Sequence, residues 1–236
     1  MRKEGIAMNI LFVCSGNTCR SAMAEGIAKQ IIQSDPKRYR QIRVASAGTY
    51  TADGESASLL AKEVASKHGV DLEHFASRQV TPALLAEADL VLAMTTSHKK
   101  LLNTLAPQAM DKIFLLKEYE YGEDVNGLNI RLGQLFEQYT AARENFVKGH
   151  QAEMAKLDEL SEKDPAAAEA LFSQLNGELT ESLKAMDGEI NTIHEKLQKM
   201  EIADPFGGDK AEYEACYIEL AASIAAVFER LTQDKV

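Results

Sequence analysis

The sequence predicts an α/β protein: a doubly wound, four-stranded parallel sheet with helices on both faces, plus an inserted antiparallel helical hairpin. Two observations predict this class. Over the first half of the chain, short apolar runs alternate with segments of helical spacing, which is typical of a parallel sheet built from strand and helix units. After Tyr119 no strand-like run follows before the last helix, and the apolar residues keep a helical period.

Four compact apolar runs are the expected strands. In chain order they are residues 8–13, 42–45, 88–94 and 112–116. Helices are expected over residues 21–32, 56–68, 97–105 and 210–231, where apolar residues recur every three or four positions. In an open sheet of this kind, ligands bind outside the carboxyl ends of the strands, near a topological switch point. Cys14 follows the first strand and therefore lies at such an end.

The late segment differs from the rest of the chain in pattern and in charge. Residues 120–202 contain 17 acidic and 8 basic side chains, and so hold nearly all of the net charge of −10. Apolar residues step by three or four from Ile130 to Phe146 and again from Leu171 to Met200, which is typical of a coiled-coil seam. Between the two runs, Asp164 and Pro165 predict a helix start. We expect an acidic helical hairpin over about residues 125–201.

Length and composition bound the organisation. A chain of 236 residues can bury one core and still carry an appendage. We expect one catalytic domain over residues 1–119 and 203–236, interrupted by an insertion over residues 120–202. The negative net charge disfavours nucleic-acid binding, and the short apolar segments predict neither a membrane span nor an export signal. Three cysteines, an odd number, predict a reducing cytoplasm. The five histidines lack metal-ligand spacing, so no metal or cofactor is expected.

The segment that carries chemistry runs from Cys14 through Ser15, Gly16, Asn17, Thr18, Cys19 and Arg20 to Ser21. It lies where the first strand leads into a helix. Successive backbone N–H groups of such a turn point inward, and the helix start adds its positive dipole end, so the loop is predicted to bind an anion. The same field is expected to hold Cys14 as a thiolate, which is the nucleophilic form of cysteine.

Side chains of this loop complete the predicted site. Arg20 can place a planar fork of donors on two phosphoryl oxygens, and Ser21 can donate its hydroxyl to the Cys14 sulfur and ease its departure. Gly16 and Asn17 are expected to adopt the positive φ angles that the cradle requires. A cysteine followed six residues later by an arginine is a weak pattern alone. The strand before it, the helix after it and the intervening Gly and Asn make phosphatase chemistry the favoured interpretation.

The loop resembles the active-site loop of the low-molecular-weight protein tyrosine phosphatases. The resemblance covers residues 8–119 and 203–232 and includes VASAGTY at 44–50, ADLVLAMTTSHK at 88–99, IFLLKEY at 113–119 and DPFGGD at 204–209. It implies a cytosolic enzyme of one α/β domain that hydrolyses phosphorylated proteins through a phosphocysteine, without a metal. By matching position, Cys14 is the nucleophile, Arg20 the phosphate ligand and Asp204 the general acid.

Asp204 also suits this role on its own chemistry. A carboxylic acid can protonate the leaving group, and the carboxylate can then activate water. A position beside Pro205 and two glycines, Gly207 and Gly208, suits a loop that reaches over the cradle. The alternative is that Asp204 only turns the chain. Phe206, in the same loop, is expected to contribute to substrate specificity.

Thr18 bears on which phosphorylated residue is the substrate. Tyrosine-specific relatives typically have a bulkier aliphatic residue there, whereas threonine resembles the protein arginine phosphatases. Threonine leaves room for a forked guanidinium and offers a hydroxyl beside the scissile bond. The alternative is that its hydroxyl bonds only the backbone of its own loop. Phosphoarginine is therefore preferred, with phosphotyrosine as the alternative.

The other two cysteines have different expectations. Cys19 is expected to be a redox partner that forms a protective disulfide with Cys14 under oxidation; the alternative is a small thiol that packs the loop. Cys216, in the last helix, is expected to be core.

The chain departs from the family pattern in two places. Ala22 follows Ser21 where proline is common, which should change only the helix entry. The insertion of residues 120–202 has no counterpart, and it can dock protein substrates, dimerise, bind a partner or cover the site. Two rival functions stay open: an arsenate reductase, which needs relay cysteines that are absent between Cys19 and Cys216, and a phosphoprotein-binding module that acts through the hairpin.

Overall fold

The computed structural model describes residues 7–233. Two compact units divide the chain, with boundaries after Glu123 and after Gln198. We call residues 7–123 and 199–233 the sheet unit and residues 124–198 the arm. These boundaries lie four residues inside the predicted insertion, 120–202, at each end.

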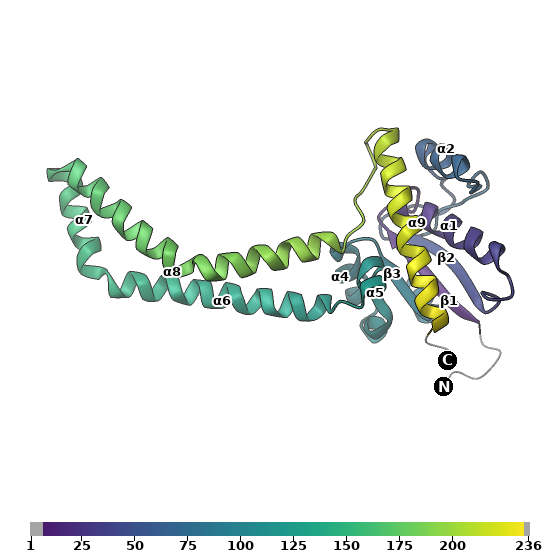
Figure 1. Ribbon diagram of the computed structural model, residues 1–236, viewed down its shortest axis with the longest axis horizontal. Helices are drawn as coiled ribbons and strands as arrows, with labels where there is room; N and C mark the ends of the chain where they lie inside the picture. Colours follow the sequence, from purple (N-terminus) through teal and green to yellow (C-terminus); the bar gives the residue numbers. More distant parts are fainter. Residues whose placement is uncertain (1–6, 234–236) are drawn as a thin grey trace. The chain divides into compact units, whose positions relative to one another are not determined.

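The sheet unit contains four parallel strands, as predicted: β1 (Met8–Cys14), β2 (Ile42–Gly48), β3 (Leu90–Ala93) and β4 (Ile113–Leu115). Their order in the sheet is β2-β1-β3-β4 (Figure 1). The chain moves outward from β1 to β2 and then returns to place β3 on the other side of β1. The topological switch point therefore lies beside β1, and Cys14 is the last residue of that strand.

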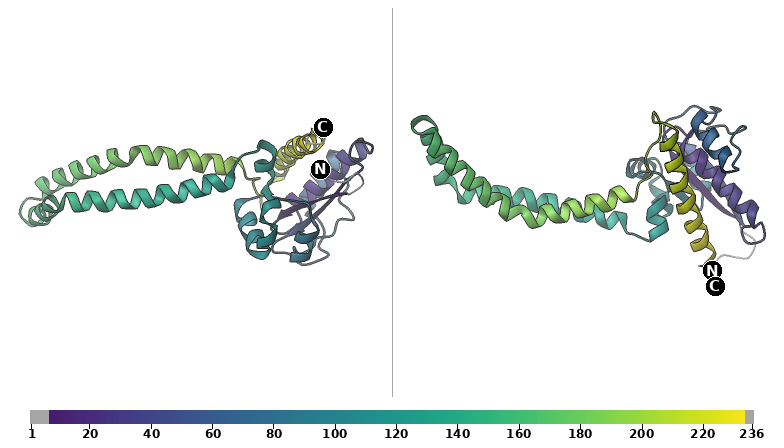
Figure 2. Two further views of the ribbon diagram at one scale, coloured as in Figure 1. Left: turned by 90° about the horizontal axis from the view of Figure 1, so that it is seen from below. Right: turned by 45° about the horizontal axis from the view of Figure 1, so that its top comes forward.

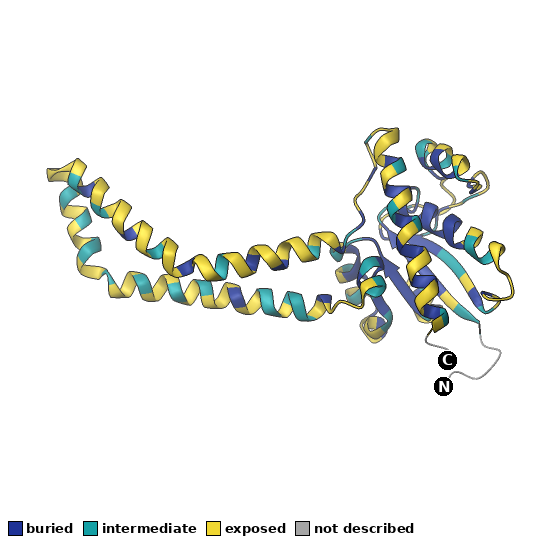
Figure 3. Cartoon of the chain, viewed as in Figure 1, coloured by how far each residue is buried: buried dark blue, intermediate teal, exposed yellow. Residues whose placement is uncertain are grey.

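Helices cover both faces of the sheet. As a result, the side chains on both faces of the central strand, β1, are buried. Ile10 and Phe12 belong to a core that also contains residues of α1 (Arg20–Ser34), α2 (Leu59–Lys67) and α9 (Lys210–Gln233). Leu11 and Val13 point to the opposite face and are also buried. On that face α4 (Thr96–Leu105) packs against β3 and β4. Figure 3 shows the sheet as the most buried layer.

Three short elements of the sheet unit were not predicted. These are α3 (Pro82–Glu87), the 3-10 helix η1 (Pro107–Lys112) and α5 (Leu116–Tyr121). The start of α3 has a clear local signal, because Thr81 accepts a hydrogen bond from the Leu84 amide and Pro82 occupies the first turn. The predicted fourth strand, 112–116, is shortened to three residues because α5 begins at Leu116.

The sheet unit keeps both segments that flank the arm. α5 packs against α9, and on the return side Ile202 is completely buried and its amide donates to the Met94 carbonyl at 2.9 Å. These contacts explain why the observed boundaries lie inside the predicted ones.

The arm consists of α6 (Val125–Gly149), α7 (Gln151–Lys163) and α8 (Pro165–Lys199, whose last residue lies in the sheet unit). Arg131 pairs with Glu189 at 2.7 Å and His150 approaches Glu178 at 3.5 Å. Because residue numbers rise on one helix as they fall on the other, α6 and α8 run in opposite directions (Figure 2). The helix start predicted at Asp164 and Pro165 is observed, with the Asp164 carboxylate accepting from the Ala167 amide.

The arm buries little. One small core joins α6 and α8 through Leu135, Ile190 and Ile193, and α7 contains no buried residue. Most arm residues are exposed (Figure 3). Among residues 7–233, no helix is long and apolar enough to cross a membrane.

Candidate active site

The predicted anion loop is a cup whose carbonyl groups face outward. β1 ends at Cys14 and α1 begins at Arg20. The carbonyls of Cys14 and Ser15 accept hydrogen bonds from the amides of Thr49 and Tyr50 at 2.9 and 3.0 Å, and the Thr18 carbonyl accepts from a further amide, that of Ser58. With these carbonyls bound to surrounding loops, the intervening amides are free to face the inside of the cup, as an anion requires.

Asn17 makes the turn possible. It is the one non-glycine residue among the described residues with a positive φ, 53°, and it is completely buried. Its side-chain amide donates to Ser21 and to Ser46 at 2.8 Å, while its oxygen accepts from the Arg78 amide at 2.9 Å. These three bonds fix the left-handed conformation, which asparagine tolerates better than most residues.

Gly16 does not adopt the positive φ that the sequence predicted. The described glycines with positive φ lie elsewhere in the chain, and a Cβ at Gly16 would meet only the Thr18 hydroxyl, at 3.5 Å. The prediction was wrong because one left-handed residue, Asn17, is enough to reverse the loop. Glycine is instead required at Gly48, at the end of β2, where a Cβ would lie 2.5 Å from the Ser15 carbonyl oxygen.

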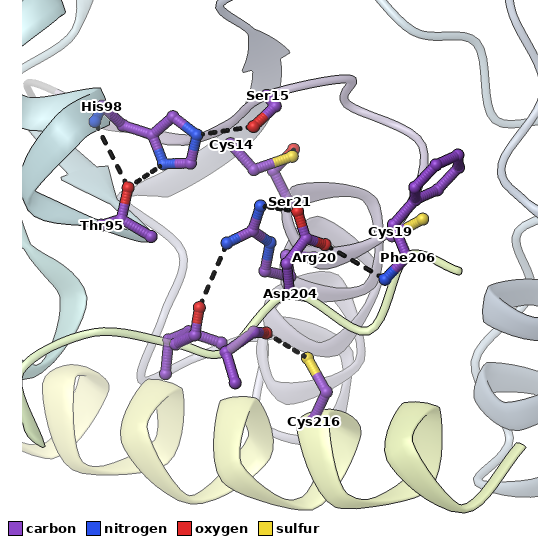
Figure 4. A network of polar contacts seen from close by, with 12 residues as sticks. Cys14, Ser15, Cys19, Arg20, Ser21, Thr95, His98, Asp204, Phe206 and Cys216 are labelled. Carbon is purple, nitrogen blue, oxygen red and sulfur yellow. Dashed lines mark hydrogen bonds and ion pairs between the residues drawn. The ribbon is translucent and has the colours of Figure 1, made fainter. Parts of the chain in front are cut away.

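Cys14 lies at the bottom of the cup and is almost completely buried. Burial raises the pKa of its thiol, and this effect outweighs the groups that lower the pKa: the Ser21 hydroxyl, the backbone amides of Ser21 and Asn17, and the Arg20 charge. The Ser21 oxygen is 3.0 Å from the Cys14 sulfur (Figure 4). The prediction of a thiolate considered only the favourable field, and the structure adds an opposing desolvation. The donors on the sulfur therefore offset only part of the rise in pKa that burial causes.

Arg20 closes the cup from the side of α1. One terminal nitrogen donates to the Ile202 carbonyl at 3.1 Å and the other to the Asp204 carboxylate at 2.5 Å. Its third nitrogen, Nε, is buried and has no hydrogen-bond partner within residues 7–233. A buried guanidinium with an unused donor beside a nest of amides is suited to a phosphoryl oxygen.

Asp204 reaches the site on the segment that returns from the arm. Its carboxylate is 46% exposed, bonds Arg20 on one side and accepts from the Phe206 amide at 3.2 Å on the other. The segment before it is held firmly: Glu201 accepts from the Thr96 amide at 2.7 Å, and Ile202 bonds the end of β3. Asp204 is thus held beside the cup while its carboxylate stays open to solvent and to a leaving group.

The two predicted specificity residues are both open to solvent, though to different degrees. Thr18 is half-buried, and its hydroxyl makes a long contact, 3.7 Å, with the Cys19 sulfur. Phe206 is 75% exposed and lies two residues after Asp204 in the same loop (Figure 4). Tyr50, whose amide holds the Ser15 carbonyl, is comparably exposed.

The remaining cysteines are free thiols. The Cys19 sulfur lies 3.3 Å from both the Ser58 and Tyr213 hydroxyl oxygens, so its contacts are with α2 and α9. Cys216 is buried in α9, and burial raises its pKa to about 12. A disulfide between Cys14 and Cys19 remains a prediction, and Cys216 is a core residue as expected.

Several residues that hold the site were missed by the sequence analysis. Glu25 accepts from the Ser46 hydroxyl at 2.6 Å, which continues the buried network from Asn17, and the Arg78 side chain donates to the Ser46 carbonyl. His98, in α4, lies 2.8 Å from the Ser15 hydroxyl. These residues are 21 to 83 positions away from their partners, and no local motif pairs them. Ser46 and His98 lie in two of the segments that carry the family resemblance, 44–50 and 88–99, but the resemblance assigned them no role.

The arrangement is suited to nucleophilic displacement at phosphorus. It combines a sulfur nucleophile, inward amides, an arginine fork and a solvent-open carboxylate. Within the described part of the chain, no group of three or more His, Cys, Asp or Glu side chains could hold a metal ion.

Comparison with protein families gives a match over residues 9–131 to the model described as low molecular weight phosphotyrosine protein phosphatase. A protein-arginine-phosphatase of Geobacillus stearothermophilus is 38% identical over 135 residues, covering 57% of this chain and 86% of the relative. One of Bacillus subtilis (strain 168) is 40% identical over 115 residues, covering 49% and 74%. A low molecular weight protein-tyrosine-phosphatase, Etp, of Escherichia coli (strain K12) is 34% identical over 111 residues, covering 47% and 70%.

A solved structure is also similar. The YwlE arginine phosphatase from Geobacillus stearothermophilus superimposes with a TM-score of 0.60 at 26% identity, covering 97% of this chain and 95% of that chain.

Proposed function

Since this chain belongs to the low molecular weight phosphotyrosine protein phosphatase family, we propose that it hydrolyses phosphoarginine in proteins through a phosphocysteine on Cys14. That it is a cysteine-dependent protein phosphatase follows from the family. The assignment of roles to its residues and the choice of phosphoarginine are our proposal. The observation that carries the roles is the convergence of the Cys14 sulfur, Arg20 and Asp204 on one cup.

In the first step, the Cys14 thiolate attacks phosphorus. A sulfur–phosphorus bond forms, and the phosphorus–nitrogen bond breaks with its electron pair passing to the guanidino nitrogen, which Asp204 protonates. Arg20 and the inward amides of the cup stabilise the charge that spreads over the phosphoryl oxygens. The unused Nε of Arg20 supports this role, because it supplies a further donor without breaking the bonds to Ile202 and Asp204.

In the second step, water attacks the phosphoryl group. The Asp204 carboxylate takes a proton from that water, the sulfur–phosphorus bond breaks, and its electron pair returns to sulfur as thiolate. Ser21 stabilises that thiolate by donating its hydroxyl across the 3.0 Å contact. Asn17 donates to the Ser21 oxygen at 2.8 Å, so the one Ser21 hydrogen is shared between the Cys14 sulfur at 3.0 Å and the Ala47 carbonyl at 3.4 Å, and the shorter contact is with the sulfur.

Thr18 carries the preference for phosphoarginine. Its side chain is half-buried, and its hydroxyl makes a long contact, 3.7 Å, with the Cys19 sulfur, so it can bond a guanidinium nitrogen of the substrate. The two protein-arginine-phosphatases among the similar proteins support the same choice. Hydrolysis of phosphotyrosine is the second candidate, favoured by the family description and by the relative from Escherichia coli.

The test compares Thr18→Ile with Thr18→Val on phosphoarginine and phosphotyrosine proteins. Isoleucine fills the space and removes the hydroxyl, whereas valine removes only the hydroxyl at nearly constant volume. We expect isoleucine to lower kcat/KM for phosphoarginine by about tenfold or more and to spare phosphotyrosine, with valine intermediate. An unchanged ratio of the two kcat/KM values in both variants would show that Thr18 does not select the substrate. Faster hydrolysis of phosphotyrosine by the unmodified enzyme would favour the second candidate.

The arm is proposed to dock basic surfaces of protein substrates. It has 14 acidic and 7 basic residues, and Asp158, Glu162 and Glu169 on α7 and α8 are exposed. Such a surface attracts cationic proteins and raises their encounter rate, most strongly at low salt. Dimerisation through exposed Phe136 and Phe172 is the alternative, which the mass of the protein in solution decides.

We further propose that the enzyme works in the cytoplasm. All three cysteines are free, and the mechanism requires a reduced Cys14. Cell fractionation that finds the protein outside the cytoplasm would contradict this location.

A further inference from the structure

Among the described histidines, His98 is the one with a hydrogen bond to the cup. The proposed catalytic steps assign it no role. It lies in the first turn of α4 and is buried. Its Nε2 is 2.8 Å from the Ser15 hydroxyl oxygen, and its Nδ1 is 2.8 Å from the Thr95 hydroxyl oxygen (Figure 4). The ring therefore bridges the start of α4 and the second residue of the cup.

The imidazole is neutral at neutral pH. Burial and, after it, the positive charge of Arg20 lower the pKa of His98 to about 4, against the raising influence of Asp204 and Glu201. A neutral imidazole has one N–H donor and one bare nitrogen acceptor. The contacts of Thr95 decide which nitrogen carries the hydrogen.

Thr95 is the N-cap of α4, and its hydroxyl oxygen accepts the backbone N–H of His98 at 3.3 Å. The hydroxyl hydrogen then needs an acceptor of its own, and Nδ1 of His98 is at hydrogen-bond distance. We assign Nδ1 as the acceptor of that hydrogen, and with this tautomer Nε2–H donates to the Ser15 oxygen. The direction of donation runs from Thr95 through His98 to Ser15.

Ser15 is consequently held from two sides. Its carbonyl accepts from the Tyr50 amide at 3.0 Å, and its side-chain oxygen accepts from His98. These two bonds fix Ser15, the residue that connects Cys14 to the rest of the cup. We propose that His98 is a positioning residue of this phosphatase, which holds Ser15 so that the first amides of the cup converge on the phosphoryl group.

This inference deepens the proposed function and rests on it only in taking the cup as the phosphate site. The experiment therefore measures the inhibition constant of inorganic phosphate against a small aryl phosphate, together with kcat. Neither quantity depends on whether the protein substrate carries phosphoarginine or phosphotyrosine. A failed Thr18 experiment would leave this test intact.

The variants are His98→Gln and His98→Asn, with Ser15→Ala alone and combined with each. The glutamine amide nitrogen reaches as far from the backbone as Nε2, so it can donate to Ser15, whereas the shorter asparagine cannot. Both replacements are polar amides, but glutamine has the higher helix propensity. Thermal unfolding of each variant records any general loss of stability.

We expect His98→Asn to weaken phosphate binding by about tenfold, the effect of losing one buried hydrogen bond, and His98→Gln to restore most of it. In the Ser15→Ala background the two variants should differ by less than about twofold, because the shared partner is gone. Equal weakening by glutamine and asparagine, or a difference that persists without the Ser15 hydroxyl, would overturn the proposal. Phosphate affinity that is unchanged in His98→Asn would do the same.

Discussion

The sheet unit and the arm use polar groups in opposite ways. Around the cup, polar side chains such as Asn17, Arg20 and Ser21 are buried and bonded to partners from distant segments. In the arm, charged pairs such as Arg131 with Glu189 lie in solvent, each side chain more than two-fifths exposed, and few residues are buried. Removing one partner of a buried polar contact costs about 1–3 kcal/mol, whereas an exposed ion pair contributes about 0–1 kcal/mol.

This difference indicates where substitutions should affect activity. A cup that holds a phosphoryl group needs its donors within a fraction of an ångström of their places, and the buried network of the sheet unit provides this. The arm needs only to keep its helices together and to present charge. Substitutions at the cup should therefore change the rate of the chemical step. Substitutions in the arm should change only which protein substrates the enzyme encounters and the rate of those encounters.

The largest effect is expected from Arg20→Lys. A lysine supplies a single point charge and cannot bond Ile202, Asp204 and a phosphoryl oxygen together. We expect kcat for a small aryl phosphate to fall by about 10²–10³-fold. The matched control is Arg38→Lys, because Arg38 bonds Glu229 at the surface of the same unit, and its loss should change kcat by less than about twofold. Similar kcat values in the two variants would remove the distinction between cup and surface.

A smaller effect is expected from Ser21→Ala, read as a pH profile. The Ser21 hydroxyl lowers the pKa of Cys14, so its removal raises that pKa. The thiolate is the form that reacts and is populated above the pKa, so the midpoint of alkylation by iodoacetate should move to higher pH. At a fixed pH below the midpoint, each unit of increase in the pKa of Cys14 lowers the alkylation rate about tenfold.

The control for this experiment is Ser223→Ala, since Ser223 is a buried serine of α9. Its alkylation profile should match that of the unmodified protein. A profile that is also unmoved in Ser21→Ala would show that this hydroxyl does not tune the nucleophile.

The smallest effect on chemistry is expected from removing the arm. Residues 124–198 are replaced by a short Gly-Ser linker, and Glu201 and Ile202 are kept because they anchor the Asp204 segment. Turnover of a small aryl phosphate should stay within about twofold, whereas kcat/KM for basic phosphoproteins should fall severalfold at low salt and converge with the intact enzyme at high salt.

A charge variant sharpens the arm experiment. Asp158→Asn, Glu162→Gln and Glu169→Gln together keep the helices and remove three exposed charges. They should reproduce part of the loss on basic proteins and none on the aryl phosphate. Equal losses of both activities after removal of the arm would contradict a docking role.

The sequence predicted what depends on local pattern. The four strands, the loop from Cys14 to Ser21 and the helix start at Asp164 each have a signal within a few residues. The φ of Gly16 was predicted wrongly, because the loop needed only one left-handed residue and side-chain contacts of Asn17 selected that one. The partners Glu25, Ser46, Arg78 and His98 were missed, since their roles arise only when the sheet brings distant segments together.

The burial of Cys14 could not be predicted from the local sequence pattern either. A sequence shows the donors around a thiolate but not the desolvation that opposes them. This balance depends on the packing of β1 between two layers of helices.

The most direct test of the account is to trap the covalent intermediate. Asp204→Asn retains the cup but loses the group that activates water, so an aryl phosphate with a good leaving group should phosphorylate the enzyme faster than water releases it. After rapid acid quench and digestion, mass spectrometry should find one phosphoryl group on the Cys14 sulfur, and none in Cys14→Ala. A phosphoryl group on another residue, or undiminished hydrolysis by Cys14→Ala, would contradict nucleophilic attack by this sulfur.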